Sequence, residues 1–183
     1  MLRNASLLLL LFSYLALQLP GLAADPLRAG AATTDISPQK LPAIRNGGFL
    51  QALADRVDDP LHARALVLKS GPETVALCVV DSCMLPTDVC DAIKARVTQQ
   101  IALPADRILI SATHTHSAPG TMEMCLGTRK DEAYTAQMIP QVAEAIVKAH
   151  AALAPAKAGW AQVDAHGFTN CRRWIRRPDK LIA

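Results

Sequence analysis

The stretch at residues 111–120, Ser-Ala-Thr-His-Thr-His-Ser-Ala-Pro-Gly, holds the side chains of this chain that are best suited to chemistry. His114 and His116 stand two residues apart. In an extended backbone such side chains point to the same side, so both imidazoles could converge on one metal ion or substrate group. Two neutral nitrogens suit zinc, which keeps one position for water in catalytic sites. The spacing is equally compatible with a strand that simply ends in polar residues.

The surroundings of the two histidines favour a functional site over a polar strand end. The apolar run at 108–110 predicts a buried strand, and Pro119-Gly120 breaks regular structure. The histidines are therefore expected where a strand gives way to a loop. Loops held by rigid strands are where binding residues concentrate.

The elements before this loop predict how it is positioned. Residues 61–68 and 74–81 read as two strands of a hairpin with a five-residue loop, and the second strand has so few polar residues that we expect it to be central and covered on both faces. A helix over 86–100 follows, with apolar residues every four positions, and then a strand over 107–111. Strand, helix and strand form a βαβ unit with parallel strands, so the histidines fall at the carboxyl end of a strand, where open α/β sheets bind ligands.

The remaining segments complete the predicted architecture. A short strand is expected at 29–36, a long helix at 133–154 and a further strand at 156–164, with Pro140 either kinking the helix or marking a later start. The fold class is therefore α/β, with a mixed sheet, one βαβ unit and flanking helices.

Residues 1–24 have the pattern of a secretory signal peptide, with a basic start, an apolar run at 7–19 and small residues at Ala23 and Ala24. We therefore expect export, to a periplasm, a cell surface or the medium. Residues 25–183 then form one domain of about 160 residues, which is enough for a sizeable core. Without Arg3, 18 Lys and Arg face 16 Asp and Glu, so overall charge gives no argument for nucleic-acid binding.

Five cysteines are an odd number for an exported protein, so at least one has no partner within a monomer. Cys78 lies in an apolar strand and is interpreted as a core residue. Cys83 and Cys90 could meet across a loop, but the sequence does not decide this pairing. The basic segment at 170–180 is either a surface cluster or the source of an arginine that binds an anion or orients a substrate.

Four segments in order, 29–38, 59–68, 80–81 and 112–120, resemble the amino-terminal part of the neutral/alkaline non-lysosomal ceramidase family. The Thr-His-Thr-His-Ser-x-Pro-Gly motif is the most specific of them, and the resemblance spans most of residues 29–173. Members of this family are zinc-dependent amidohydrolases that cut the amide of ceramide into a sphingoid base and a fatty acid. The resemblance implies a lipid substrate, ceramide or another N-acyl amide, and with it a peripheral membrane contact.

The resemblance also implies roles for individual residues. His114 matches a zinc ligand, and His116 is expected to handle a proton or hold substrate in the same site. The family's active-site arginine follows an asparagine, and Arg172 is the better match because Cys171 interrupts the pair here. Asp81 matches an acidic residue at a strand end, where it would orient a histidine or cap a loop.

The chemistry so implied is zinc-assisted amide hydrolysis. Zinc lowers the pKa of bound water to about 7 and polarises the carbonyl, while His116 could protonate the leaving amine or stabilise the tetrahedral oxyanion. The family's other zinc ligands, a histidine, a glutamate and a tyrosine, come from later sequence. We therefore expect the chain to be an incomplete portion of a larger α/β catalytic domain and to be inactive alone. Two alternatives stay open, a metal hydrolase acting on another amide or ester and a non-catalytic or truncated secreted domain, and the sequence does not indicate the oligomeric state.

Overall fold

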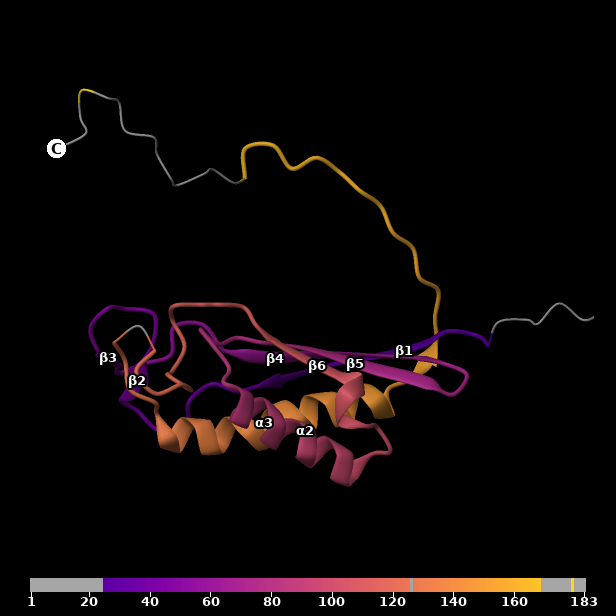
Figure 1. Cartoon of the computed structure of the whole chain (residues 1–183), viewed down its shortest axis with the longest axis horizontal. Helices are drawn as coiled ribbons and strands as arrows, with labels where there is room; N and C mark the ends of the chain where they lie inside the picture. The colour runs from indigo at the N-terminus through magenta and orange to yellow at the C-terminus, as the bar shows by residue number, and fades with distance from the viewer. Residues whose placement is uncertain (1–24, 126, 169–178, 180–183) are drawn as a thin grey trace, which may run out of the picture.

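The computed structural model describes residues 25–125, 127–168 and 179 (Figure 1). The predicted signal peptide, Cys171 and Arg172 therefore lie outside the described residues. Neither α-helix in the described part of the chain is both long and apolar enough to cross a bilayer.

The centre of the fold is a five-stranded mixed sheet in the order β6-β5-β4-β1-β7. Only β5 and β6 run parallel, and the other neighbouring strands are antiparallel. This arrangement confirms the predicted mixed sheet. The strands are β1 (Arg28–Asp35), β4 (His62–Ser70), β5 (Glu73–Val80), β6 (Ile108–Ala112) and β7 (Ala154–Pro155), and a separate two-stranded sheet pairs β2 (Ala43–Arg45) with β3 (Ala52–Ala54).

The predicted βαβ unit is confirmed as β5, α2 (Thr87–Gln100) and β6. Pro86 stands immediately before α2, and the helix buries the residues that recur every four positions, Val89, Ile93 and Val97. A short 3-10 helix, η1 (Ala105–Arg107), leads into β6. One further hydrogen bond follows the paired residues of β5 and β6, from the backbone N–H of Thr113 to the carbonyl of Val80 over 3.0 Å. The loops that follow the two strands therefore start side by side.

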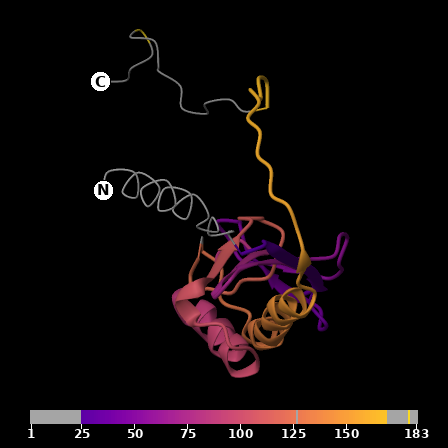
Figure 2. The ribbon, with the colours of Figure 1, turned by 90° about the vertical axis from the view of Figure 1, so that its right-hand side faces the viewer.

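The long helix α3 (Glu132–Ala151) runs through Pro140, so the later start considered from the sequence is wrong. Asp131 caps its first turn, accepting a hydrogen bond from the backbone N–H of Tyr134. Both helices pack on one face of the sheet (Figures 1 and 2). The core between the two layers includes the buried side chains Val67, Val80, Ile93, Met138 and Ile146.

The prediction that β5 is covered on both faces is wrong for the described part of the chain. The strand is central, but Leu77 and Val79 are 37% and 41% exposed. Alternate residues of a strand point to opposite faces, and α2 and α3 cover only one of them. Leu66 on β4 and Leu109 on β6 are exposed as well.

Two further expectations differ from the structure. The hairpin between β4 and β5 turns over two residues rather than five, with Gly71 in the left-handed region at φ 54°. The strand expected at 156–164 does not form: only β7 pairs, with β1, and the chain then leaves the sheet (Figure 1). Residues 157–168 are exposed, so they lack the packing that would hold a strand in place.

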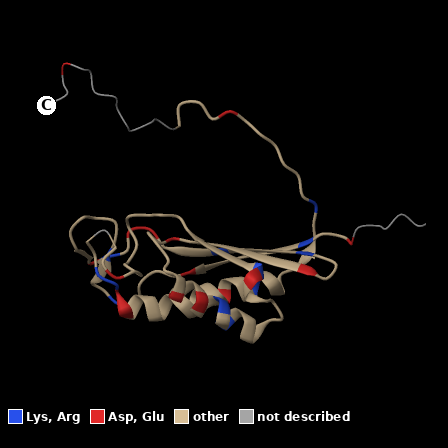
Figure 3. Ribbon diagram, viewed as in Figure 1, with Lys and Arg blue, Asp and Glu red and all other residues tan. Residues whose placement is uncertain are grey.

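Basic and acidic residues are interspersed along the helices (Figure 3). On α3, Lys148 and Glu144 form an ion pair of 2.8 Å one helical turn apart.

Candidate metal centre

The two histidines of the motif converge. The Nε2 atoms of His114 and His116 lie 3.3 Å apart, with the rings edge to face. Two nitrogens bound to one tetrahedral zinc ion at about 2.0–2.1 Å are separated by about 3.3–3.4 Å. The observed separation matches this value, and it is also the length of an N–H···N hydrogen bond between the two rings.

The backbone orients His114 and fixes the position of its proton. Its Nδ1 lies 2.8 Å from the carbonyl oxygen of Cys83. A carbonyl only accepts hydrogen bonds, so Nδ1 carries the hydrogen and Nε2 of the neutral ring presents a lone pair. Metal-binding histidines commonly donate their other N–H in this way. His114 is thus held in the tautomer that a metal requires.

The convergence does not arise from an extended backbone, as the spacing suggested. His114 has φ 60°, in the left-handed region. That conformation costs roughly 1–2 kcal/mol for a residue other than glycine. It redirects the chain immediately after β6 and brings the imidazole to the loop that follows β5. Backbone strain of this kind is concentrated at functional sites.

Cys83 brings a third potential ligand atom close to the two histidines, which the sequence interpretation missed. One ligand atom from each of Cys83, His114 and His116 lies within 4.8 Å of the others, and Cys83 Sγ is 3.9 Å from His114 Nδ1. A thiolate and two imidazoles form a ligand set that zinc accepts. Burial raises the pKa of the Cys83 thiol, and the neighbouring Cys125 raises it further. Metal binding would therefore have to displace a proton from Cys83.

The segment that follows β2 contacts His116 and limits its position. The backbone N–H of Asn46 donates to the carbonyl of Ala118 over 2.9 Å, two residues beyond His116. Gly47 approaches so closely that a Cβ built on it would lie 2.3 Å from the Cβ of His116. Only a glycine fits at this position without moving the histidine, and its φ of 98° also favours glycine.

Asp81 does not orient either histidine of the motif. Its Oδ2 accepts hydrogen bonds from Arg64 Nη1 at 2.8 Å and from the backbone N–H of His62 at 2.9 Å. Asp81 therefore links the end of β5 to β4. The sequence left two roles open for Asp81, and in the structure it does not orient a histidine of the motif.

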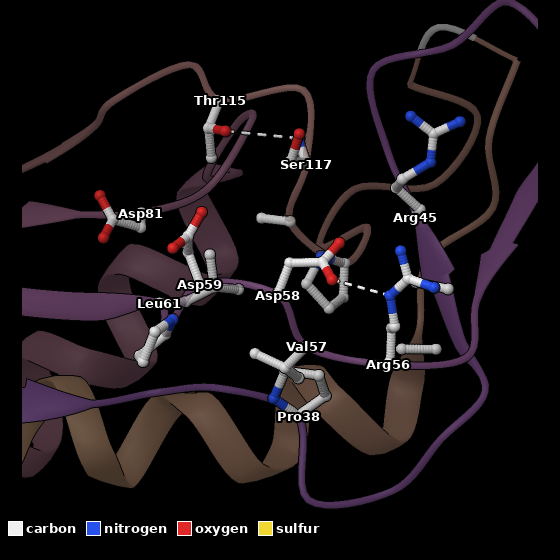
Figure 4. A pocket seen from close by; sticks show the side chains of 15 residues that line it. Pro38, Arg45, Arg56, Val57, Asp58, Asp59, Leu61, Asp81, Thr115 and Ser117 are labelled. Carbon is white, nitrogen blue, oxygen red and sulfur yellow. Dashed lines mark hydrogen bonds and ion pairs between the residues drawn. The ribbon is translucent and has the colours of Figure 1, made fainter.

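A cavity of about 510 Å³ opens beside the motif (Figure 4). Thr115 and Ser117 line it, and neither His114 nor His116 does. The wall also carries charges of both signs, including the ion pair of Arg56 with Asp58 at 2.7 Å. The cavity and the histidine pair are therefore neighbours along the same loop without sharing a wall.

The other residues singled out from the sequence do not join the histidine pair. The Nδ1 atom of His62 lies 3.3 Å from Nη2 of Arg64, at the start of β4. His150 is near the end of α3, and His166 is in the exposed segment after β7. Arg172, the predicted substrate-orienting arginine, lies outside the described residues, so its place relative to His116 stays a prediction.

Comparison with solved structures gives this arrangement a context. The chain is similar to the neutral ceramidase from Pseudomonas aeruginosa, with a TM-score of 0.64 and 21% identity over 71% of this chain and 22% of that one. A structure described as a ceramidase complexed with C2 is similar at a TM-score of 0.61 and 23% identity, again over 71% of this chain and 22% of that one. The sequence matches no family model and no curated protein. The chain thus spans 22% of the length of these structures, and its described part has the fold of a portion of a neutral ceramidase.

Proposed function

We propose that this chain is part of a zinc-dependent amidohydrolase that cleaves the N-acyl amide of ceramide or a related lipid. The observation that carries the proposal is the 3.3 Å separation between the Nε2 atoms of His114 and His116. The ceramidase-like fold supports hydrolysis as the reaction class. Because the chain spans 22% of such a structure, the activity belongs to the longer protein of which this chain would be a part.

The residues of the site can be given distinct tasks. His114 holds the ion through Nε2, since its Nδ1 hydrogen is engaged by the carbonyl of Cys83. Cys83 Sγ lies 3.9 Å from Nδ1 of the same ring and is a further potential ligand atom near the two histidines. A bound zinc ion would supply hydroxide near neutral pH and polarise the amide carbonyl.

His116 delivers a proton to the leaving amine in this proposal. Its ring is exposed, so a substrate can reach it. Its Nε2 is also close enough to His114 to bind the same ion directly. Arg172 would orient the carbonyl or a substrate hydroxyl.

Zinc titration by calorimetry tests the metal site on the reduced chain. His114→Ala should abolish stoichiometric binding, and His166→Ala, in the exposed segment after β7, should leave it unchanged. If His116→Ala binds zinc normally and loses hydrolysis in the full-length protein, His116 is the proton donor. If it loses zinc as His114→Ala does, it is a ligand. Wild-type zinc affinity in His114→Ala would contradict the proposal.

We also propose that the protein is exported and acts at a membrane surface, as a lipid substrate requires. The apolar run and small residues at 1–24 support cleavage after Ala23 or Ala24. Amino-terminal sequencing of the protein from its native host would show a mature chain starting at Ala24 or Asp25. A retained Met1 would contradict cleavage.

A further inference from the structure

The backbone carbonyl of Met84 accepts hydrogen bonds from two buried hydroxyl groups. Ser82 Oγ donates to it over 2.9 Å, and Thr121 Oγ1 donates to it as well. Ser82 and Thr121 are 0% and 1% exposed, so water does not compete for either hydroxyl. A carbonyl oxygen has two lone pairs and can accept both hydrogen bonds at once. Met84 therefore joins the loop after β5 to the loop that follows the histidine motif.

These two hydrogen bonds fix the backbone around Cys83. The bond from Ser82 to Met84 spans Cys83, which lies between them in the chain, and holds a turn there. The bond from Thr121 reaches the same carbonyl from the other loop. The carbonyl of Cys83 is the group that accepts the hydrogen of His114 Nδ1, over 2.8 Å. The direction of this carbonyl thus depends on a turn that two hydroxyl groups hold in place.

We propose that Ser82 and Thr121 are positioning residues that fix the tautomer of His114. They hold the turn at Cys83 and so direct its carbonyl at Nδ1 of His114. Which nitrogen of a neutral imidazole carries the hydrogen is set by the hydrogen bonds that the two nitrogens make. Without a directed carbonyl the ring divides between its two tautomers. Only the tautomer with the hydrogen on Nδ1 presents a lone pair on Nε2.

The consequence for the metal rests on the proposed function, whereas the tautomer is a property of the metal-free protein. Removing a group that orients a metal-binding histidine typically weakens metal binding by about tenfold to a hundredfold. Ser82 and Thr121 act through the carbonyl of Cys83, one hydrogen bond further from the ring. We therefore expect the loss of either hydroxyl to lie at the lower end of this range.

Four variants separate the hydroxyl groups from the packing of their side chains. Thr121→Val keeps the shape of the buried side chain and removes its hydroxyl, whereas Thr121→Ser keeps the hydroxyl. Ser82→Ala removes the other donor and decides the proposal if Thr121→Val does not fold. Thr98→Val is the matched control, because Thr98 Oγ1 makes the same kind of bond on α2, to the carbonyl of Ala95 over 2.9 Å.

Heteronuclear NMR of the imidazole nitrogens measures the tautomer in the metal-free, reduced full chain, at a pH at which the ring is neutral. The His114 signals are identified by their absence from the His114→Ala spectrum. Wild type, Thr121→Ser and Thr98→Val should carry the hydrogen on Nδ1, and Thr121→Val and Ser82→Ala should also populate the tautomer with the hydrogen on Nε2. A loss of stability alone does not produce this change, because the spectrum reports folded molecules.

The same spectra contain the results that would overturn the proposal. A folded Thr121→Val protein with only the wild-type tautomer would remove the role of Thr121, and the same result in Ser82→Ala would remove that of Ser82. A wild-type His114 ring with its hydrogen on Nε2 would overturn the proposal for both residues.

Calorimetric zinc titration of these variants tests the consequence for the metal. Affinity should fall about tenfold in Thr121→Val, return in Thr121→Ser and stay at the wild-type value in Thr98→Val. Unchanged affinity in a folded Thr121→Val protein would overturn the link between the tautomer and the metal. Absence of zinc binding in the wild-type chain would instead count against the proposed function and would leave the NMR result unaffected.

Discussion

Replacing Gly47 by alanine should damage the candidate metal centre through His116. The new Cβ would lie 2.3 Å from the Cβ of His116 and 2.5 Å from its Cα and Cγ. Carbon atoms approach one another favourably at about 3.5–4.0 Å, so His116 must retreat by about 1 Å. Metal–ligand distances tolerate only about 0.2 Å. A ring displaced this far can no longer share an ion with His114.

The size of the effect follows from this displacement. If His116 is a ligand, zinc affinity should fall at least about tenfold to a hundredfold, which corresponds to about 1.4–2.8 kcal/mol. Folding should also weaken, because the φ of Gly47 is 98° and a left-handed backbone costs roughly 1–2 kcal/mol for alanine. Calorimetric zinc titration measures the first effect, and urea denaturation followed by circular dichroism measures the second.

Gly48→Ala is the matched control. Its Cβ would meet the backbone of Leu50, with the carbonyl oxygen at 3.1 Å and the nitrogen at 3.9 Å, and Gly48 is not in the left-handed region. This variant should keep wild-type zinc affinity. A folded Gly47→Ala protein with wild-type zinc affinity would refute the reasoning, because it would show that His116 either moves without consequence or does not take part in binding.

Three further substitutions test the backbone and packing around the site, each by urea denaturation. The His114→Gly variant should be more stable than the His114→Ala variant by roughly 1 kcal/mol, because φ at this position is 60°. In a helix alanine is the more stabilising of the two residues, so a more stable alanine variant here would contradict the left-handed conformation of His114. Asp131→Ala should lower the free energy of unfolding by roughly 2 kcal/mol, because the two carboxylate oxygens accept hydrogen bonds from the first turn of α3 and from the backbone N–H of Ile44. A loss below about 0.5 kcal/mol would mean that water replaces both hydrogen bonds. Gly30→Ala places a Cβ 2.1 Å from the carbonyl oxygen of Ala149 and should push β1 away from α3, which should lower the free energy of unfolding by about 1–3 kcal/mol. An unchanged free energy of unfolding would mean that α3 shifts freely.

The sequence was most informative where burial dictates residue type. The four-residue recurrence of Val89, Ile93 and Val97 predicted α2, and the apolar run before the histidines predicted β6. Their order along the chain required parallel pairing of β5 with β6, as observed. The convergence of His114 and His116 was expected from an extended backbone, whereas the left-handed backbone of His114 accompanies it in the structure. The helix, the strand and their pairing depend on periodicity and connectivity, which a sequence displays directly.

The sequence was less informative where the outcome depends on contacts between distant segments. The apolar character of β5 suggested two covered faces, but Leu77 is exposed because both helices lie on the same side of the sheet. Nothing in the local pattern marks His114 as left-handed. Cys83 lacks a local signal too, and its place beside His114 depends on how the loop after β5 meets the loop after β6.

One observation about the candidate site was nevertheless implicit in the topology. Parallel neighbours end at the same edge of a sheet, so the loops after β5 and β6 must begin side by side. Cys83 lies three residues after β5, and His114 lies two residues after β6. The hydrogen bond from His114 Nδ1 to the carbonyl of Cys83 joins these two loops directly. A search restricted to spacing within one motif finds the histidine pair, whereas a search across the ends of parallel strands would also have found the cysteine.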